Sequence, residues 1–162
     1  MKKIIYIALI GLLSGCATQY QSSGFSGGFT DTELAPGYYR ITFRGNGVTS
    51  GERVSDFALL RASELMINRQ CKNFQVLNSK DSVNTSYYST PQTTTTNVSA
   101  YRYGNYINGS ATSVSSGGGV EAVNRARSTI EVRCVNQEPD PSVNIFDAIF
   151  INQKLKQKYK ID

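Results

Sequence analysis

The sequence predicts an α+β domain, with a small mixed sheet built on a β-α-β unit and a late antiparallel strand. One main helix is expected on one face of the sheet, followed by a short C-terminal helix. Three patterns carry this prediction. Residues 39–43 and 126–135 alternate between apolar and polar side chains, and residues 52–67 repeat their apolar side chains with a helical period.

The β-α-β unit is expected between residues 36 and 78. Tyr39, Ile41 and Phe43 alternate with polar residues, which is the period of two of a half-buried strand. The run Gly45-Asn-Gly then predicts a turn, because glycine and asparagine tolerate positive φ. The unit therefore begins with a strand that ends in a sharp change of direction.

The main helix is expected to begin at Thr49, three residues before Glu52, which is the spacing of a capping box. Ser63 falls on the polar side at 100° per residue. Leu60 and Ile67 form a second apolar line on that side, so we expect another element to cover them. The broad apolar arc consists of Val54, Phe57, Ala58, Ala62, Leu65 and Met66.

Two further strands are expected. Residues 74–77 form a short apolar segment after Cys71, and a strand, helix and strand normally give a parallel pair with a right-handed crossover. In the late strand, Ile130, Val132 and Cys134 share one face. We expect Cys134 to point inward and this strand to pair beside residues 74–77.

The C-terminal helix is expected to begin at Asp140, because Pro141 suits the first helical turn. It is our candidate cover for Leu60 and Ile67. Residues 154–161 alternate lysine with other residues, which allows a helix end or a strand. The predicted apolar face consists of Val143, Ile145, Phe146, Ile149 and Phe150.

The first fifteen residues have the features of a lipoprotein signal peptide. Met1 to Lys3 are basic, and Ile4 to Leu13 are apolar but shorter than the roughly 20 residues that span a bilayer. Residues 13–16, Leu-Ser-Gly-Cys, resemble the bacterial lipobox, which implies lipidation of Cys16. An ordinary signal peptide with an incidental cysteine is the alternative.

Composition and the lipobox together suggest where the domain lies. Residues 16–33 are rich in Gln, Ser and Gly and are expected to be a flexible tether, with a single domain at 34–162. Ala17 follows the cysteine, where an Asp marks inner-membrane retention in lipoproteins of this kind. The resemblance therefore implies an outer-membrane lipid anchor and a domain that faces the periplasm.

Residues 81–119 form a Ser/Thr/Tyr-rich region with few aliphatic side chains, expected to be an extended hairpin or a mobile loop. Its tyrosines are suited to stacking on carbohydrate, or they form cross-strand pairs on an exposed hairpin. These tyrosines are Tyr87, Tyr88, Tyr101, Tyr103 and Tyr106.

Charge and composition exclude several functions. The net charge is +5, falling to +3 when Lys2 and Lys3 leave with the signal, and histidine is absent. Export and mild charge argue against nucleic-acid binding, and the lack of histidine removes the commonest general base and metal ligand. Glu52 and Asp56 alone specify no metal site. We expect no cofactor, no metal and no catalytic residue.

Cys71 and Cys134 are the cysteines that remain after lipidation, and a disulfide between them suits an oxidising compartment. Two free thiols are the alternative. The bridge would close a loop of roughly 63 residues, contributing about 4 kcal/mol by the chain-entropy model.

The glycine-rich turn offers one candidate binding site. Its spacing differs from a dinucleotide-binding loop, because the third glycine comes one position late. Arg44, Gly47 and Arg53 instead suggest an anion site beside the free amides of the helix start.

Three segments resemble a family of small proteobacterial outer-membrane lipoproteins with no assigned reaction. They are residues 39–47 (YRITFRGNG), 49–54 (TSGERV) and 59–65 (LLRASEL). The resemblance implies a lipoprotein with a small α/β fold. We therefore expect a non-enzymatic envelope protein that binds a protein or the cell wall. An envelope enzyme or ligand sensor using Arg44 and Arg53 is the alternative, and oligomeric state is left open.

Overall fold

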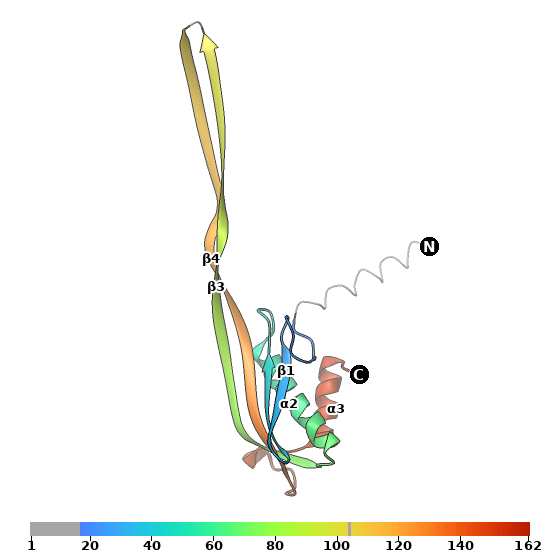
Figure 1. The fold of residues 1–162 in the computed structure, drawn as a ribbon. Coiled ribbons are helices and arrows are strands. Elements are labelled where there is room, and N and C mark those ends of the chain that lie inside the picture. The colour runs from blue at the N-terminus through green and yellow to red at the C-terminus, as the bar shows by residue number, and fades with distance from the viewer. Residues whose placement is uncertain (1–16, 104) are drawn as a thin grey trace, which may run out of the picture. The chain divides into compact units, whose positions relative to one another are not determined.

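The computed structural model describes residues 17–103 and 105–162 (Figure 1). Cys16, with its expected lipidation, and the predicted signal peptide lie outside these residues. The chain divides into two compact units. The hairpin unit is Thr85–Val123, and the core unit contains the described residues up to Asn84 and from Asn124 onward.

A five-stranded antiparallel sheet with two helices gives the mixed α+β class that the sequence predicts. The strand order is β1-β2-β4-β3-β5. The strands are β1 (Gly28–Ala35), β2 (Tyr38–Arg44), β3 (Asn73–Tyr103), β4 (Tyr106–Val135) and β5 (Ile145–Asp147).

The predicted neighbouring parallel pair does not form, because β4 lies between β2 and β3. Ile41 of β2 faces Ile130 of β4 in an antiparallel register. β3 and β4 are consecutive strands of one hairpin, and local antiparallel pairing places β4 beside β3. The predicted contact between residues 74–77 and the late strand is therefore confirmed, while the β-α-β pairing is not.

The N-cap of helix α2 (Gly51–Asn68) lies one residue later than predicted. Ser50, not Thr49, is the N-cap, and its hydroxyl accepts a hydrogen bond from the Arg53 amide at 3.2 Å. Thr49 is buried, and its hydroxyl donates a hydrogen bond to the Asn46 side chain instead. The helix buries Val54, Phe57, Ala58, Leu60, Ala62, Ser63 and Met66, so Ser63 does not lie on a solvent face as predicted.

The core lies on one face of the sheet, against α2, as the sequence predicts. Ile41, Phe43 and Val132 are fully buried there. The opposite face is polar, with Arg40 bonded to Glu131. An antiparallel sheet with one packed and one solvated face explains the clean alternation of β2.

The C-terminal segment differs from the predicted single helix. Asp140 caps a 3-10 turn, η2 (Pro141–Val143), after which Ile145 and Phe146 belong to β5 and pair with β3. Asp147 then caps α3 (Ala148–Tyr159), so the lysines up to 158 are helical. Over this short run the apolar positions fit both an alternating and a helical pattern. The sequence therefore predicts one helix where the structure has a turn, a strand and a helix.

Helix α3 packs on α2, as predicted for a covering element. Leu60 is fully buried, and the Asn152 amide donates to the Ser63 hydroxyl at 3.1 Å. Ile67 is 37% exposed, so only Leu60 of the two residues predicted to be covered is buried.

The expected tether over residues 16–33 is wrong for its described part. Residues 28–33 lie in β1, whose Phe29 pairs with Phe43 of β2. Thr18 is 2% exposed, and Tyr20 stacks on Phe29 with ring centroids 5.0 Å apart. Serine and glycine here build tight turns, so a composition typical of linkers belongs to the folded domain.

Cys71 and Cys134 are joined by a disulfide, as predicted. Their Cα atoms are 5.9 Å apart, within the range that a bridge requires. Cys71 follows the end of α2, and Cys134 lies near the end of β4. The bridge therefore fixes the helix to the sheet at one end of the core unit.

Of the two alternatives predicted for residues 81–119, an extended hairpin and a mobile loop, the structure shows the extended hairpin. Hydroxyls bond across its two strands, with Thr94 to Ser115 and Thr96 to Ser113 each at 2.9 Å. Gly117 and Gly118 both have φ of +77°. A Cβ on Gly117 would lie 2.7 Å from the Pro91 carbonyl oxygen, so the backbones of the two strands approach closely here.

Candidate functional site

The side chain of Thr18 organises one end of the core unit. Its hydroxyl donates to the Ser26 carbonyl at 2.7 Å and accepts from the Asn46 amide at 2.8 Å. Its backbone amide donates to the Thr49 hydroxyl at 2.9 Å. One buried residue thus connects the N-terminal segment to two loops and to the start of α2.

The two loops around Thr18 are residues 23–27 and 45–49. The first is a tight turn closed by hydrogen bonds between Gly24 and Gly27. A Cβ on Gly27 would lie 2.3 Å from the Arg44 carbonyl, and Gly27 has φ of +104°, so only glycine fits. This close approach brings the two loops side by side.

A concavity of about 560 Å³ lies between these loops. Arg44 and Gly47 line it, as the predicted anion site requires, together with Arg125. Sequence reasoning missed Arg125 because it comes from β4, far along the chain. The guanidinium groups of Arg44 and Arg125 give the lining of this concavity a positive charge.

Arg53, the third predicted member of the site, lies elsewhere. Its guanidinium stacks over the rings of Phe57 and Tyr159, at 4.9 and 5.1 Å from their centroids. It lines a second hollow of about 480 Å³, which Gln19 and Lys160 also line. The structure therefore separates Arg53 from Arg44 and Gly47.

Tyr159 and the acidic side chains of α2 form a small network beside this second hollow. Tyr159 donates to Asp56 at 2.7 Å, and Lys158 pairs with both Glu52 and Asp56. Burial, followed by the hydrogen bond to Asp56, raises the pKa of Tyr159 to about 12. Glu52 and Asp56 are thus engaged with a lysine rather than arranged around a metal ion.

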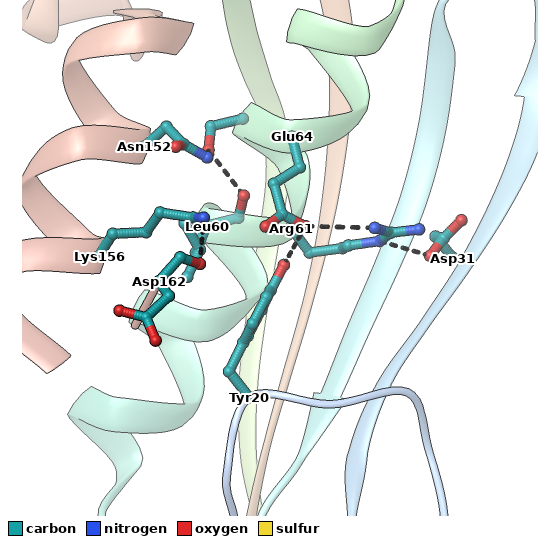
Figure 2. A network of polar contacts seen from close by, with 9 residues as sticks. Tyr20, Asp31, Leu60, Arg61, Glu64, Asn152, Lys156 and Asp162 are labelled. Carbon is teal, nitrogen blue, oxygen red and sulfur yellow. Dashed lines mark hydrogen bonds and ion pairs between the residues drawn. The ribbon is translucent and has the colours of Figure 1, made fainter. Parts of the chain in front are cut away.

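A second polar network fixes the N-terminal segment to the helix (Figure 2). Figure 2 shows Arg61 between Asp31 and Glu64, with its Nε donating to Asp31 at 2.8 Å. Tyr20 donates to the same Glu64 carboxylate. Burial, then this hydrogen bond, raises the pKa of the Tyr20 hydroxyl. Arg61 lies 4.4 Å from the Phe29 ring centroid, which stabilises its position.

Sequence reasoning missed Thr18 and Tyr20 because it assigned them to the tether. A tyrosine at position 20 and a phenylalanine at position 29 were the available signals, since flexible tethers rarely contain aromatic residues. Neither polar network includes a nucleophile held by a base, so each has the character of a structural contact.

The hairpin unit presents a different kind of surface. Between Thr85 and Val123, the described strand pairings join β3 only to β4, leaving both outer edges without a neighbouring strand. Tyr87, Tyr101 and Tyr106 are 71%, 76% and 83% exposed. Such edges present rows of backbone donors and acceptors.

Within 17–103 and 105–162, no group of three or more His, Cys, Asp or Glu side chains is placed to hold a metal ion. In the same part of the chain, no helix has both the length and the apolar character needed to cross a membrane.

Comparisons of the chain with protein-family models, curated proteins and solved structures found no match.

Proposed function

We propose that this chain is a lipid-anchored protein of the bacterial cell envelope that binds a partner through its hairpin unit. Cys16 would carry the lipid at the outer membrane, with the domain in the periplasm. The role is non-enzymatic. The observation that carries the proposal is the long two-stranded hairpin with open edges.

The hairpin lacks the usual protection against strand addition. An isolated two-stranded hairpin is marginally stable in water, and exposed edges normally carry charges or proline. Residues 85–123 contain only Arg102 and Glu121 as charged residues and Pro91 as a proline. Addition of a partner strand would satisfy the open backbone groups, a common mode of recognition.

Anchoring in the envelope is supported by two further features. The lipobox-like residues 13–16 precede the folded part directly, and Cys71–Cys134 forms the kind of bridge that persists in oxidising compartments. The resemblance to proteobacterial outer-membrane lipoproteins agrees with this assignment.

Site-specific photo-crosslinking in intact envelopes tests the binding role. A photoreactive residue at Thr95 should crosslink to one discrete partner, because this exposed position lies on the hairpin. The same residue at Gln153, exposed on α3, is the matched control. Equal crosslinks from both positions, or none from Thr95, would overturn the proposal.

Lipidation has its own test. Changing Cys16→Ser should leave the protein unprocessed and unlabelled by a fatty-acid probe, because the thiol is the acylated group. Normal labelling of this variant would overturn the lipid anchor while leaving the hairpin's binding role intact.

The exposed tyrosines favour one second candidate, stacking on cell-wall glycan. Purified sacculi should then bind the protein, and Tyr87→Ala with Tyr101→Ala should abolish that binding. The other alternative, an anion sensor, would use Arg44, Gly47 and Arg125, since Arg53 lies apart from them.

A further inference from the structure

Two apolar side chains are exposed at the tips of the loops around Thr18. Phe25 occupies the two-residue turn between Gly24 and Gly27 and is 112% exposed. Val48 is 64% exposed in the second loop. Neither position requires an apolar residue for folding, because neither side chain packs on the core.

The lipid attachment point lies very close to these loops. Thr18 is buried and bonded to both loops, and it follows Cys16 by only two residues. Two residues span at most roughly 7 Å of extended chain. A lipid on Cys16 would therefore hold this end of the core unit against the bilayer surface.

Basic side chains accompany the apolar tips. Arg44 and Arg125 line the concavity between the loops, and Arg53 and Lys160 line the hollow beside Gln19. Among the ion pairs of residues 17–103 and 105–162, none involves Arg44. Each basic side chain beside a bilayer contributes about 1 kcal/mol of binding free energy through its attraction to anionic lipid headgroups.

We propose that residues 23–27 and 45–49 form a lipid-contact face. Phe25 and Val48 enter the boundary between headgroups and acyl chains, while Arg44 and Arg125 bind lipid phosphates. The proposal rests on the proposed lipid anchor at Cys16, which selects a membrane rather than another occupant. Aromatic tips beside basic groups are the composition of interfacial anchors.

Tryptophan fluorescence tests the contact, since the chain contains no tryptophan of its own. The mature protein carrying Phe25→Trp is placed on vesicles of phosphatidylethanolamine and phosphatidylglycerol. Its emission should shift to the blue and be quenched by brominated acyl chains. The control is Phe150→Trp, at a 57% exposed position near the start of α3, and it should do neither.

The arginines are tested by transfer of the protein between vesicles. Arg44→Gln and Arg125→Gln should each raise the transfer rate roughly fivefold, the equivalent of about 1 kcal/mol per cation. Arg133→Gln, at an exposed site near the disulfide, should leave the rate unchanged. Equal effects of all three changes would overturn the lipid-phosphate contact.

The outcomes separate this proposal from the anchor itself. Mass spectrometry shows whether Cys16 carries acyl chains. A lipidated, vesicle-bound Phe25→Trp protein whose emission stays that of an exposed indole overturns the lipid-contact face alone. An unlipidated protein overturns the anchor, and the same fluorescence measurement still decides whether the loops bind lipid. If inorganic phosphate accelerates transfer as the arginine changes do, and the introduced indole stays exposed, the concavity binds free anions instead.

Discussion

At the scale of single residues, the hydroxyl of Thr18 holds several segments together. It joins residues 23–27, residues 45–49 and the start of α2 through bonds that are buried or partly buried. A buried donor or acceptor that loses its partner costs more than the bond contributes, because its desolvation is then uncompensated.

Thr18→Val should therefore lower the free energy of unfolding by about 1–3 kcal/mol, since valine keeps the shape and removes the hydroxyl. Urea denaturation followed by circular dichroism measures this loss. Thr18→Ser keeps the hydroxyl and should lose clearly less. Equal losses in the two variants would show that the hydrogen bonds contribute nothing.

Glu131 on the solvated face predicts a pH dependence. The hydrogen bond from Tyr38, then that from Arg40, lowers the pKa of its carboxyl below the ordinary 4.5. A lowered pKa in the folded state gives stability that is present above the unfolded value and lost as pH falls through the folded value.

The wild-type protein should therefore lose more stability than Glu131→Gln between about pH 5 and pH 3. Urea denaturation of both proteins at a series of pH values gives the difference. Identical pH profiles would show that this carboxylate has the same pKa when the chain is unfolded.

At the scale of elements, the hairpin unit should be the least protected part of the described chain. Amide exchange should be fast in residues 85–123, because their outer edges face solvent, and slow in 39–43, 57–66 and 130–134. Mass spectrometry of exchanged peptides measures this. Protection of the hairpin equal to that of the core would contradict the expectation for the unbound protein.

Removing the hairpin tests whether it serves the fold. Joining Asn84 to Asn124 through an Asn-Gly turn should change the thermal midpoint little, because the buried core lies in the core unit. Crosslinking to the proposed partner should be lost. A variant that fails to fold would show that the hairpin stabilises the core unit.

The elements differ in how far sequence predicts them. β2 and α2 are predictable because one face of each is buried, so periodicity is strong. β1 was missed because Thr30, Asp31, Thr32 and Glu33 show no apolar alternation. An edge strand is held by backbone bonds to one neighbour, which any side chain permits.

The strand order and the candidate site depend on contacts between distant residues. β4 pairs with β2 across more than eighty residues, and no local pattern encodes that choice over the predicted parallel pair. For the same reason the sequence does not predict that Arg125 lines the same concavity as Arg44. Arg53 lies apart from both, with its guanidinium over the rings of Phe57 and Tyr159.

At the scale of the whole molecule, the disulfide should contribute substantially to stability. Cys71→Ala with Cys134→Ala should cost about 4 kcal/mol, because the bridge removes unfolded conformations of a loop of 63 residues. Thiol counting on the denatured, unreduced protein should find neither of these cysteines free. Two free thiols would reject the bridge.

The same bridge makes the hairpin part of a covalent ring. Every residue from 72 to 133, including the hairpin tip, lies between the two bonded cysteines. If a protease cut the exposed strands, the two fragments would remain one molecule, because the disulfide would still join the C-terminal fragment to the N-terminal one. Nicked protein should therefore run as one band on a non-reducing gel and as two after reduction. Anything bound to β4 would accordingly stay joined to the N-terminal fragment after a single cut.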